Sequence, residues 1–218
     1  MRAAVRNAIE QAGILPAIRV SSPEDAVFAA ETIYAGGLRV VELTMTVPGA
    51  IFVLSQLKAS HPDLLVGAGT VLDTDTAKDC LAAGAAFLTS PGFEPSVLAL
   101  GIAAGVLVIP GVLTPTEVMM ASKAGAEFVK VFPCAAMGGP AYIKALKAPF
   151  PHVAMIASGG VTQQTAGEFI RAGAVAVGIR EELIPPDAVS RRDQQWIGEL
   201  THRFQTIVKR AGTQRSGH

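Results

Sequence analysis

Hydrophobic residues along this chain gather in eight short runs, and a longer stretch with the spacing of an amphipathic helix follows each run. A short apolar run bounded by turn residues is typical of a buried strand. The predicted strands cover residues 15–20, 40–45, 64–69, 86–89, 106–109, 127–132, 153–157 and 174–179. The predicted helices between them cover residues 23–35, 50–60, 74–83, 94–104, 116–124, 142–146 and 164–172. Regular alternation of strand and helix predicts an α/β fold with a parallel sheet.

Turn and cap residues mark where the predicted helices begin and end. Ser22, Glu94 and Thr114 stand directly before prolines, as N-cap residues do. Glycine can take the left-handed conformation just past a helix without steric cost, and it stands there at Gly36-Gly37, Gly84, Gly105, Gly125 and Gly173. A strand-helix unit of about 20–25 residues that repeats eight times predicts a (β/α)8 TIM barrel.

The barrel is expected to be a single domain over residues 1–218, because barrels of about 200–250 residues often form one domain. Residues 2–12 are predicted to form an extra helix across the barrel bottom. Residues 193–211 are predicted to form a C-terminal helix with Trp196, Leu200 and Ile207 on its inner face. The alternative is an open doubly wound sheet, but no Gly-x-Gly-x-x-Gly segment follows the first strand.

Composition narrows the class of function. The 218 residues include 18 Lys and Arg against 18 Asp and Glu, and 50% of them are hydrophobic. Without a basic surplus the chain has little attraction for nucleic acid or a membrane surface, so we expect a small-molecule protein. Residues 1–12 lack the apolar core of a signal peptide, and no window approaches about 18 consecutive apolar residues. These features predict a cytoplasmic protein.

Two cysteines, Cys80 and Cys134, are too few to suggest a disulfide scaffold and are expected to be reduced. Cys134 follows Lys130 by four residues. It either lines the same pocket or packs as a small core residue.

Lys130 is a lone lysine in the otherwise apolar run Phe128-Val129-Lys130-Val131-Phe132. Burial disfavours the charged form of an amine, and a neutral lysine attacks carbonyl groups to form Schiff bases. The alternative is that Lys130 ends its strand and extends to solvent, as most lysines near apolar surface do.

Glu42 is the second charged residue in an apolar predicted strand. A buried carboxylate holds its proton more readily, so it can both take and give protons near neutral pH. The alternative is a salt bridge with Arg19 on the neighbouring strand. In a barrel the chemistry lies at the C-terminal ends of the strands. Lys130 and Glu42 together therefore suggest covalent amine catalysis with a proton shuttle.

Other residues at the predicted strand ends suit an anionic small molecule. Arg19 offers a fixed fork for a carboxylate, and Thr70 adds a hydroxyl. Gly159 and Gly160 precede a helix, where exposed amides form an anion site, and barrels commonly bind phosphate after strands seven and eight. The same two glycines also fit a tight loop without a ligand.

The chain contains five motifs in a fixed order: VELTMTVPGA (41–50), VGAGTVL (66–72), SPG (90–92), FVKVFP (128–133) and GGV (159–161). In these motifs it resembles the 2-dehydro-3-deoxy-phosphogluconate (KDPG) aldolases, which include bifunctional enzymes that also cleave 4-hydroxy-2-oxoglutarate (KHG). The resemblance implies a class I aldolase, a homotrimer of (β/α)8 barrels without metal or cofactor. Such an enzyme splits a 2-keto-3-deoxy sugar acid into pyruvate and an aldehyde, here glyceraldehyde 3-phosphate or glyoxylate.

Residue roles follow from the resemblance motif by motif. Lys130 matches the Schiff-base lysine, and Glu42 matches the general acid and base. The matching substrate-binding positions are Thr70 for the pyruvate carboxylate, Pro91 and Phe132 for the pocket walls, and Gly159 and Gly160 for the phosphate-binding turn.

Two departures from the family pattern affect substrate binding. Thr46 stands where many members carry a carboxylate-binding arginine, and Arg19 fits that task instead. The last strand ends Gly178-Ile179-Arg180-Glu181, where the family usually has Gly-x-Gly-Ser. Arg180 can bind phosphate in a bidentate contact, whereas an inward Glu181 would repel it. An unphosphorylated keto-deoxy acid is therefore an alternative substrate. A phosphogalactonate-type acid is another, because Arg19 resembles the arginine at the end of strand one in the related phosphogalactonate aldolases.

Two other classes of function remain open from the sequence. A phosphosugar isomerase or epimerase would use the Gly159-Gly160 turn and two acid/base groups without an imine. A binding or assembly protein would keep the barrel without turnover. The Schiff-base aldolase is the favoured prediction.

Overall fold

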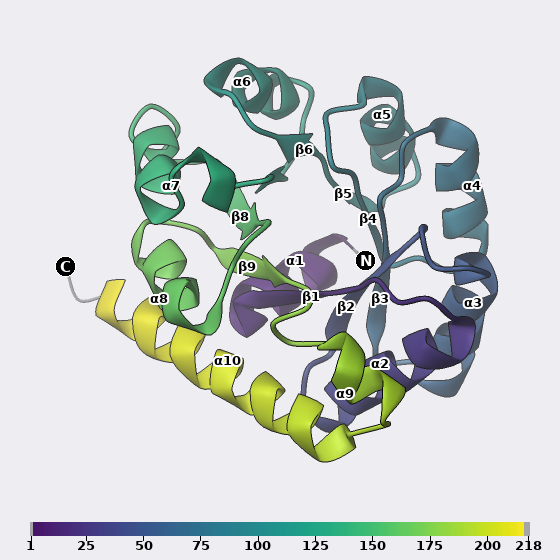
Figure 1. Cartoon of the computed structure of the whole chain (residues 1–218). Helices are drawn as coiled ribbons and strands as arrows, with labels where there is room; N and C mark the ends of the chain where they lie inside the picture. Colours follow the sequence, from purple (N-terminus) through teal and green to yellow (C-terminus); the bar gives the residue numbers. More distant parts are fainter. Residues whose placement is uncertain (1, 216–218) are drawn as a thin grey trace.

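The strands form a ring with helices around its outside (Figure 1). The computed structural model describes residues 2–215, within which nine parallel strands follow the order β5-β4-β3-β2-β1-β9-β8-β7-β6. The strands are β1 (Ile14–Ile18), β2 (Val40–Thr44), β3 (Leu65–Gly69), β4 (Phe87–Thr89), β5 (Leu107–Ile109), β6 (Gly111–Val112), β7 (Phe128–Val131), β8 (Ala154–Ser158) and β9 (Ala176–Ile179). The two ends of this order, β5 and β6, are consecutive in the chain, so the ring closes through them.

Pro110 divides the fifth predicted strand into β5 and β6. Proline lacks the N–H group that a continuous ladder needs, so pairing changes partner at this point. β5 pairs with β4, while β6 pairs with β7 and places Gly111 opposite Lys130. The Pro110 carbonyl accepts a hydrogen bond from the Lys130 N–H at 2.8 Å. The predicted (β/α)8 barrel is confirmed, and the open-sheet alternative is wrong.

The helices lie close to their predicted positions. They are α1 (Arg2–Ala12), α2 (Pro23–Ala35), α3 (Ala50–Ser60), α4 (Thr74–Ala82), α5 (Pro95–Ala103), α6 (Pro115–Lys123), α7 (Pro140–Lys147), α8 (Gln163–Arg171), α9 (Pro186–Ser190) and α10 (Gln194–Arg215). The sequence reading missed α9 and a turn of 3-10 helix at Ala135–Met137. It also ended the terminal helix too early. Leu200 is buried, and Trp196 and Ile207 pack against the core, as predicted.

The predicted caps hold the helix ends. Ser22 Oγ accepts a hydrogen bond from the Asp25 N–H at 3.1 Å at the start of α2. Thr114 and Glu117 form a reciprocal capping box at the start of α6. Of the predicted C-terminal glycines, Gly36 has a φ of −71°, whereas the other five have positive φ, from 68° to 113°. These local signals explain why the helix boundaries could be predicted closely.

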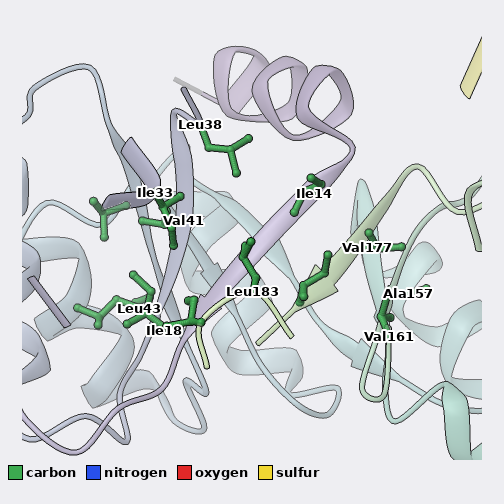
Figure 2. Close-up of a cluster of buried hydrophobic side chains, with 14 of the residues drawn as sticks. Ile14, Ile18, Ile33, Leu38, Val41, Leu43, Ala157, Val161, Val177 and Leu183 are labelled. Atoms are coloured by element: carbon green, nitrogen blue, oxygen red, sulfur yellow. The ribbon is translucent and has the colours of Figure 1, made fainter. Parts of the chain in front are cut away.

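Two apolar layers position the site. An outer layer lies between the strands and the helices, and part of it, including Val41, Leu43 and Val177, is shown in Figure 2. An inner layer fills the barrel, and Val5 and Ile9 of α1 contribute to it from below. Helix α1 lies across one end of the ring (Figure 1). The barrel is therefore closed at the bottom, and its functional end is the opposite one, at the carboxyl ends of the strands.

Candidate active site

Alternate residues of each strand point into the barrel, because side chains along a strand alternate between its two faces. Val40 on β2 and Phe128 on β7 belong to the inner apolar cluster. Glu42 and Lys130 are the next inward positions on the same two strands, one step closer to the open end. The fold therefore brings both charged groups to the barrel axis, directly above an apolar floor.

Lys130 and Glu42 form a close pair inside the barrel. Lys130 Nζ lies 3.2 Å from both carboxylate oxygens of Glu42. The side chains are 12% and 2% exposed, respectively. Lys130 Nζ also lies 5.9 Å from the centroid of the Phe132 ring. An amine and a carboxylate that lie this close together and are this well shielded from solvent can exchange protons with each other and with a bound molecule.

Gly69 on β3 leaves the space that the Glu42 carboxylate occupies. A Cβ atom added to Gly69 would lie 2.3 Å from Glu42 Oε1 and 2.6 Å from its carboxyl carbon. No side chain can therefore be added at Gly69 without moving the Glu42 carboxylate. The glycine-rich motif at 66–72 thus supports Glu42 rather than a dinucleotide phosphate.

Arg19 contacts Thr70, not Glu42. Arg19 Nη2 donates a hydrogen bond to Thr70 Oγ1 at 3.1 Å. Thr70 has a φ of 60°, an unusual value for a β-branched residue, and such strain tends to persist at functional sites. The alternative of an Arg19–Glu42 salt bridge is wrong, because the carboxylate pairs with Lys130. Arg19 is exposed and free to turn its guanidinium toward an anion.

A cavity of about 340 Å³ opens above the Lys130–Glu42 pair. Of the residues singled out from the sequence, it is lined by Arg19, Glu42, Lys130, Phe132, Gly159, Gly160, Gly178 and Arg180. Thr70 and Pro91 do not line it, although Thr70 contacts Arg19. Most of the residues that the sequence singled out therefore lie around one cavity of small-molecule size.

The ends of β8 and β9, with the loops that follow them, form one wall of this cavity. Ser158, the last residue of β8, contributes a hydroxyl, and Arg180, Glu181 and Glu182 after β9 contribute charged groups. Arg180 Nη2 lies 2.9 Å from Glu181 Oε1, and both side chains are largely exposed. The sequence reading did not select Ser158, Glu181 or Glu182 as binding residues. Their position at the end of β8 and after β9 was the available signal, because cavity walls in barrels come from the carboxyl ends of the strands and the loops that follow.

Cys134 packs behind the glycine turn and does not line the cavity. Its Sγ lies 3.5 Å from the carbonyl oxygen of Gly159, and burial raises the pKa of its thiol to about 11. Burial likewise raises the pKa of the Cys80 thiol to about 11. Both residues are core thiols, so the pocket alternative for Cys134 is wrong.

Residues 2–215 contain neither a metal-binding cluster nor a membrane-spanning helix. No group of three or more His, Cys, Asp or Glu side chains in this range is arranged to hold a metal ion. No helix among the same residues is long and apolar enough to cross a membrane.

Comparison with known proteins places the chain in a family. The family model described as KDPG and KHG aldolase matches residues 5–200. The chain belongs to this aldolase family. A 2-dehydro-3-deoxy-phosphogluconate aldolase from Treponema pallidum is 32% identical, over 92% of this chain and 96% of its own length. The KHG/KDPG aldolase of Escherichia coli is 31% identical, over 86% and 88% of the two chains.

A solved structure of the same family agrees over almost the whole barrel. It is a KDPG aldolase from Legionella pneumophila with pyruvate captured as a covalent carbinolamine intermediate. The TM-score is 0.85 and the identity 33%, and the match covers 90% of this chain and 96% of the other. The predicted family and enzyme class are confirmed.

Proposed function

We propose that the protein is a class I aldolase that uses Lys130 as its Schiff-base residue and Glu42 as its general acid and base. It cleaves a 2-keto-3-deoxy sugar acid to pyruvate and an aldehyde. The observation that carries the proposal is the contact of 3.2 Å between Lys130 Nζ and the Glu42 carboxylate at the floor of the cavity. An isomerase or epimerase would use the same two groups as acid and base without forming an imine.

The reaction begins with proton transfer within the pair. Glu42 takes a proton from the Lys130 ammonium group, and the neutral amine attacks the C2 ketone. Glu42 then gives its proton to the oxygen on C2, takes a second proton from the nitrogen and passes it to the same oxygen. The C2–O bond breaks, water leaves, and the freed nitrogen lone pair forms the iminium. Arg19 holds the substrate carboxylate, together with the Thr70 hydroxyl that it contacts.

Cleavage uses the iminium as an electron sink. Glu42 removes the proton of the C4 hydroxyl, the C3–C4 bond breaks, and its electron pair forms the enamine while the aldehyde leaves. The enamine is then protonated at C3, and water attacks the regenerated iminium to release pyruvate and free Lys130. Phe132 and the glycines after β8 wall this space.

Release of pyruvate tests the proposal. Purified protein is incubated with 2-dehydro-3-deoxy-6-phosphogluconate, its unphosphorylated form or 4-hydroxy-2-oxoglutarate, and pyruvate is followed with lactate dehydrogenase and NADH. The proposal expects oxidation of NADH with at least one of these acids. Tight binding of the acids without any release of pyruvate would favour a binding protein instead.

The charged wall after β9 favours a substrate whose far end is not a phosphate dianion. Glu181 and Glu182 place two negative charges there against one positive charge of Arg180, and Glu181 already pairs with Arg180. The amides before α8 attract anions, but their combined effect is smaller than a full charge. Although its relatives are named for a phosphorylated acid, we propose that this chain prefers a free keto-deoxy acid.

Glu181→Gln is expected to shift this preference. In the unchanged enzyme, kcat/KM for 2-dehydro-3-deoxygluconate should exceed that for its 6-phosphate by about tenfold, since two partly screened carboxylates face the dianion. Glu181→Gln removes one of them and frees Arg180, so the ratio should fall toward one. Added salt should lower the ratio as well, because it screens exposed charges.

Glu168→Gln is the matched control, since Glu168 lies on α8, is exposed and does not line the cavity. The control should leave the ratio as it is. A wild-type preference for the phosphate ester would contradict the proposed selectivity but not the aldolase reaction.

We further propose that the enzyme is a homotrimer. Several large apolar side chains are exposed on the single chain, including Phe52 at 70%, Leu72 at 60% and Met120 at 48%. Exposed apolar side chains favour association where they gather into a patch, and the number three comes from the family resemblance. Sedimentation equilibrium should give three times the chain mass of 22.5 kDa. Cytoplasmic location and a single domain over residues 1–218 stay predictions.

A further inference from the structure

Thr89 carries a buried hydroxyl for which residues 2–215 offer no hydrogen-bond partner. Its side chain is 0% exposed, so bulk water does not reach it. The other buried threonines, Thr32, Thr44 and Thr201, each donate to a main-chain carbonyl. Buried polar groups are nearly always paired, and an unpaired one calls for an explanation such as a catalytic role.

Thr89 points into the barrel. On β4, Phe87 belongs to the inner cluster and Leu88 to the outer one. Because side chains alternate along a strand, Thr89 faces the same way as Phe87, one step closer to the open end. This is the relation that Glu42 has to Val40 on β2.

Strand register places Thr89 at the height of Glu42. In an eight-stranded barrel with a shear of eight, the residue at the same height along the barrel axis is about one position beyond the paired residue on the next strand. Glu42 pairs with Gly67, so the β3 residue at the same height along the barrel axis as Glu42 is the next one, Ala68. Ala68 in turn pairs with Leu88, so the β4 residue at this height is Thr89.

The same rule continues from Thr89 to Lys130. Thr89 pairs with Ile109, so the next residue, Pro110, lies at the height of Thr89. Gly111 pairs with Lys130, so Pro110 lies opposite the residue before Lys130. With the same offset of one residue, the β7 residue at the height of Pro110 is Lys130 itself. Barrel interiors are built of layers in which alternate strands each contribute one side chain. Thr89 is therefore in the layer of the Lys130–Glu42 pair and stands between the two strands that carry them.

We propose that the Thr89 hydroxyl positions the oxygen that leaves C2 of the substrate. This inference rests on the proposed aldolase reaction. When the C2–O bond breaks, Glu42 supplies the proton and the oxygen becomes water, which Thr89 retains by a hydrogen bond. That water then relays a proton from C3 of the iminium to the Glu42 carboxylate. The C3–H electron pair becomes the C2–C3 double bond of the enamine, and the proton returns by the same route. Thr89 is a positioning residue in this scheme, and Glu42 remains the acid and base.

Exchange of the pyruvate methyl protons isolates this step. Pyruvate is incubated with enzyme in D2O, and loss of the methyl signal is followed by NMR, while borohydride trapping reports imine formation separately. Thr89→Val keeps the shape and removes the hydroxyl. It should slow exchange about ten- to hundredfold, the value of one hydrogen bond to a reacting group, with trapping retained. Thr89→Ser restores the hydroxyl and should recover most of the exchange.

A structural role predicts a different pattern. If the hydroxyl were merely an unpaired group, Thr89→Val would remove the cost of burying it and raise the Tm by about 2–4 °C, with exchange unchanged. That result would overturn the proposal, as would slow exchange in Thr89→Ser equal to that of Thr89→Val. Absence of any trapped adduct in the wild-type protein would instead overturn the aldolase reaction itself.

Discussion

Lys130→Ala is expected to abolish the pyruvate adduct and to lower kcat/KM for cleavage by at least about a thousandfold. The amine is the group that forms the covalent bond, and removing it leaves no electron sink for cleavage of C3–C4. Trapping with borohydride and the lactate dehydrogenase assay measure the two effects. The size of the loss separates a nucleophile from a residue that merely holds the substrate by its charge.

Stability needs a control in this experiment, because removing Lys130 leaves Glu42 buried without its partner. Loss of one member of a buried ion pair costs about 3–5 kcal/mol. Lys130→Arg keeps a positive charge beside Glu42 but does not form an imine, and the cavity above the pair has room for the larger head group. A folded Lys130→Arg enzyme that still yields an adduct or cleaves substrate would show that Lys130 is not the nucleophile.

Glu42→Gln is expected to lower kcat by about 10²- to 10⁴-fold, the usual contribution of a general acid and base. The amide keeps the shape of the carboxyl group but neither takes a proton from Lys130 nor returns one to the C2 oxygen. Adduct formation should still reach completion, although slowly, because the nucleophile remains. The rate of trapping and the rate of methyl exchange should fall together, since both depend on the same carboxylate.

Gly69→Ala tests the position of the Glu42 carboxylate without changing its chemistry. The added Cβ would lie 2.3 Å from Glu42 Oε1, so the carboxylate has to move. The variant should lose kcat in the same direction as Glu42→Gln. Gly198→Ala is the matched control, because a Cβ there has nothing within 4 Å. A Gly69→Ala enzyme with wild-type kcat would mean that the exact placement of Glu42 beside Lys130 does not matter.

Much of the barrel could be predicted because its local signals agree with one another. Capping residues such as Ser22 and Thr114, and glycines with positive φ after the helices, set boundaries that the structure reproduces closely. Short helix α9 was missed because it lacks a periodic apolar face, although Pro185-Pro186 marks its start. The division of one strand at Pro110 depends on how β4 and β7 are placed, which no local pattern contains.

The candidate site likewise contains residues that the sequence could predict and residues that only the structure identifies. A lysine and a glutamate inside apolar strands are visible as anomalies in the sequence, and period-two alternation explains why both reach the axis. Thr89 is different, because a threonine at the end of an apolar run is ordinary. What sets it apart is that its buried oxygen has no partner within the described chain. The Arg180–Glu181 contact also required the structure, since the sequence indicated only that Arg180 can bind phosphate and that an inward Glu181 would repel it.

Borohydride reduction of the wild-type protein with pyruvate, followed by peptide mapping, tests the central claim most directly. The account predicts one reduced pyruvate per chain, attached to the peptide that contains Lys130. The adduct should not form when pyruvate is omitted. An adduct on a different lysine, or a protein that stays unmodified at saturating pyruvate, would contradict the assignment of Lys130 as the Schiff-base residue.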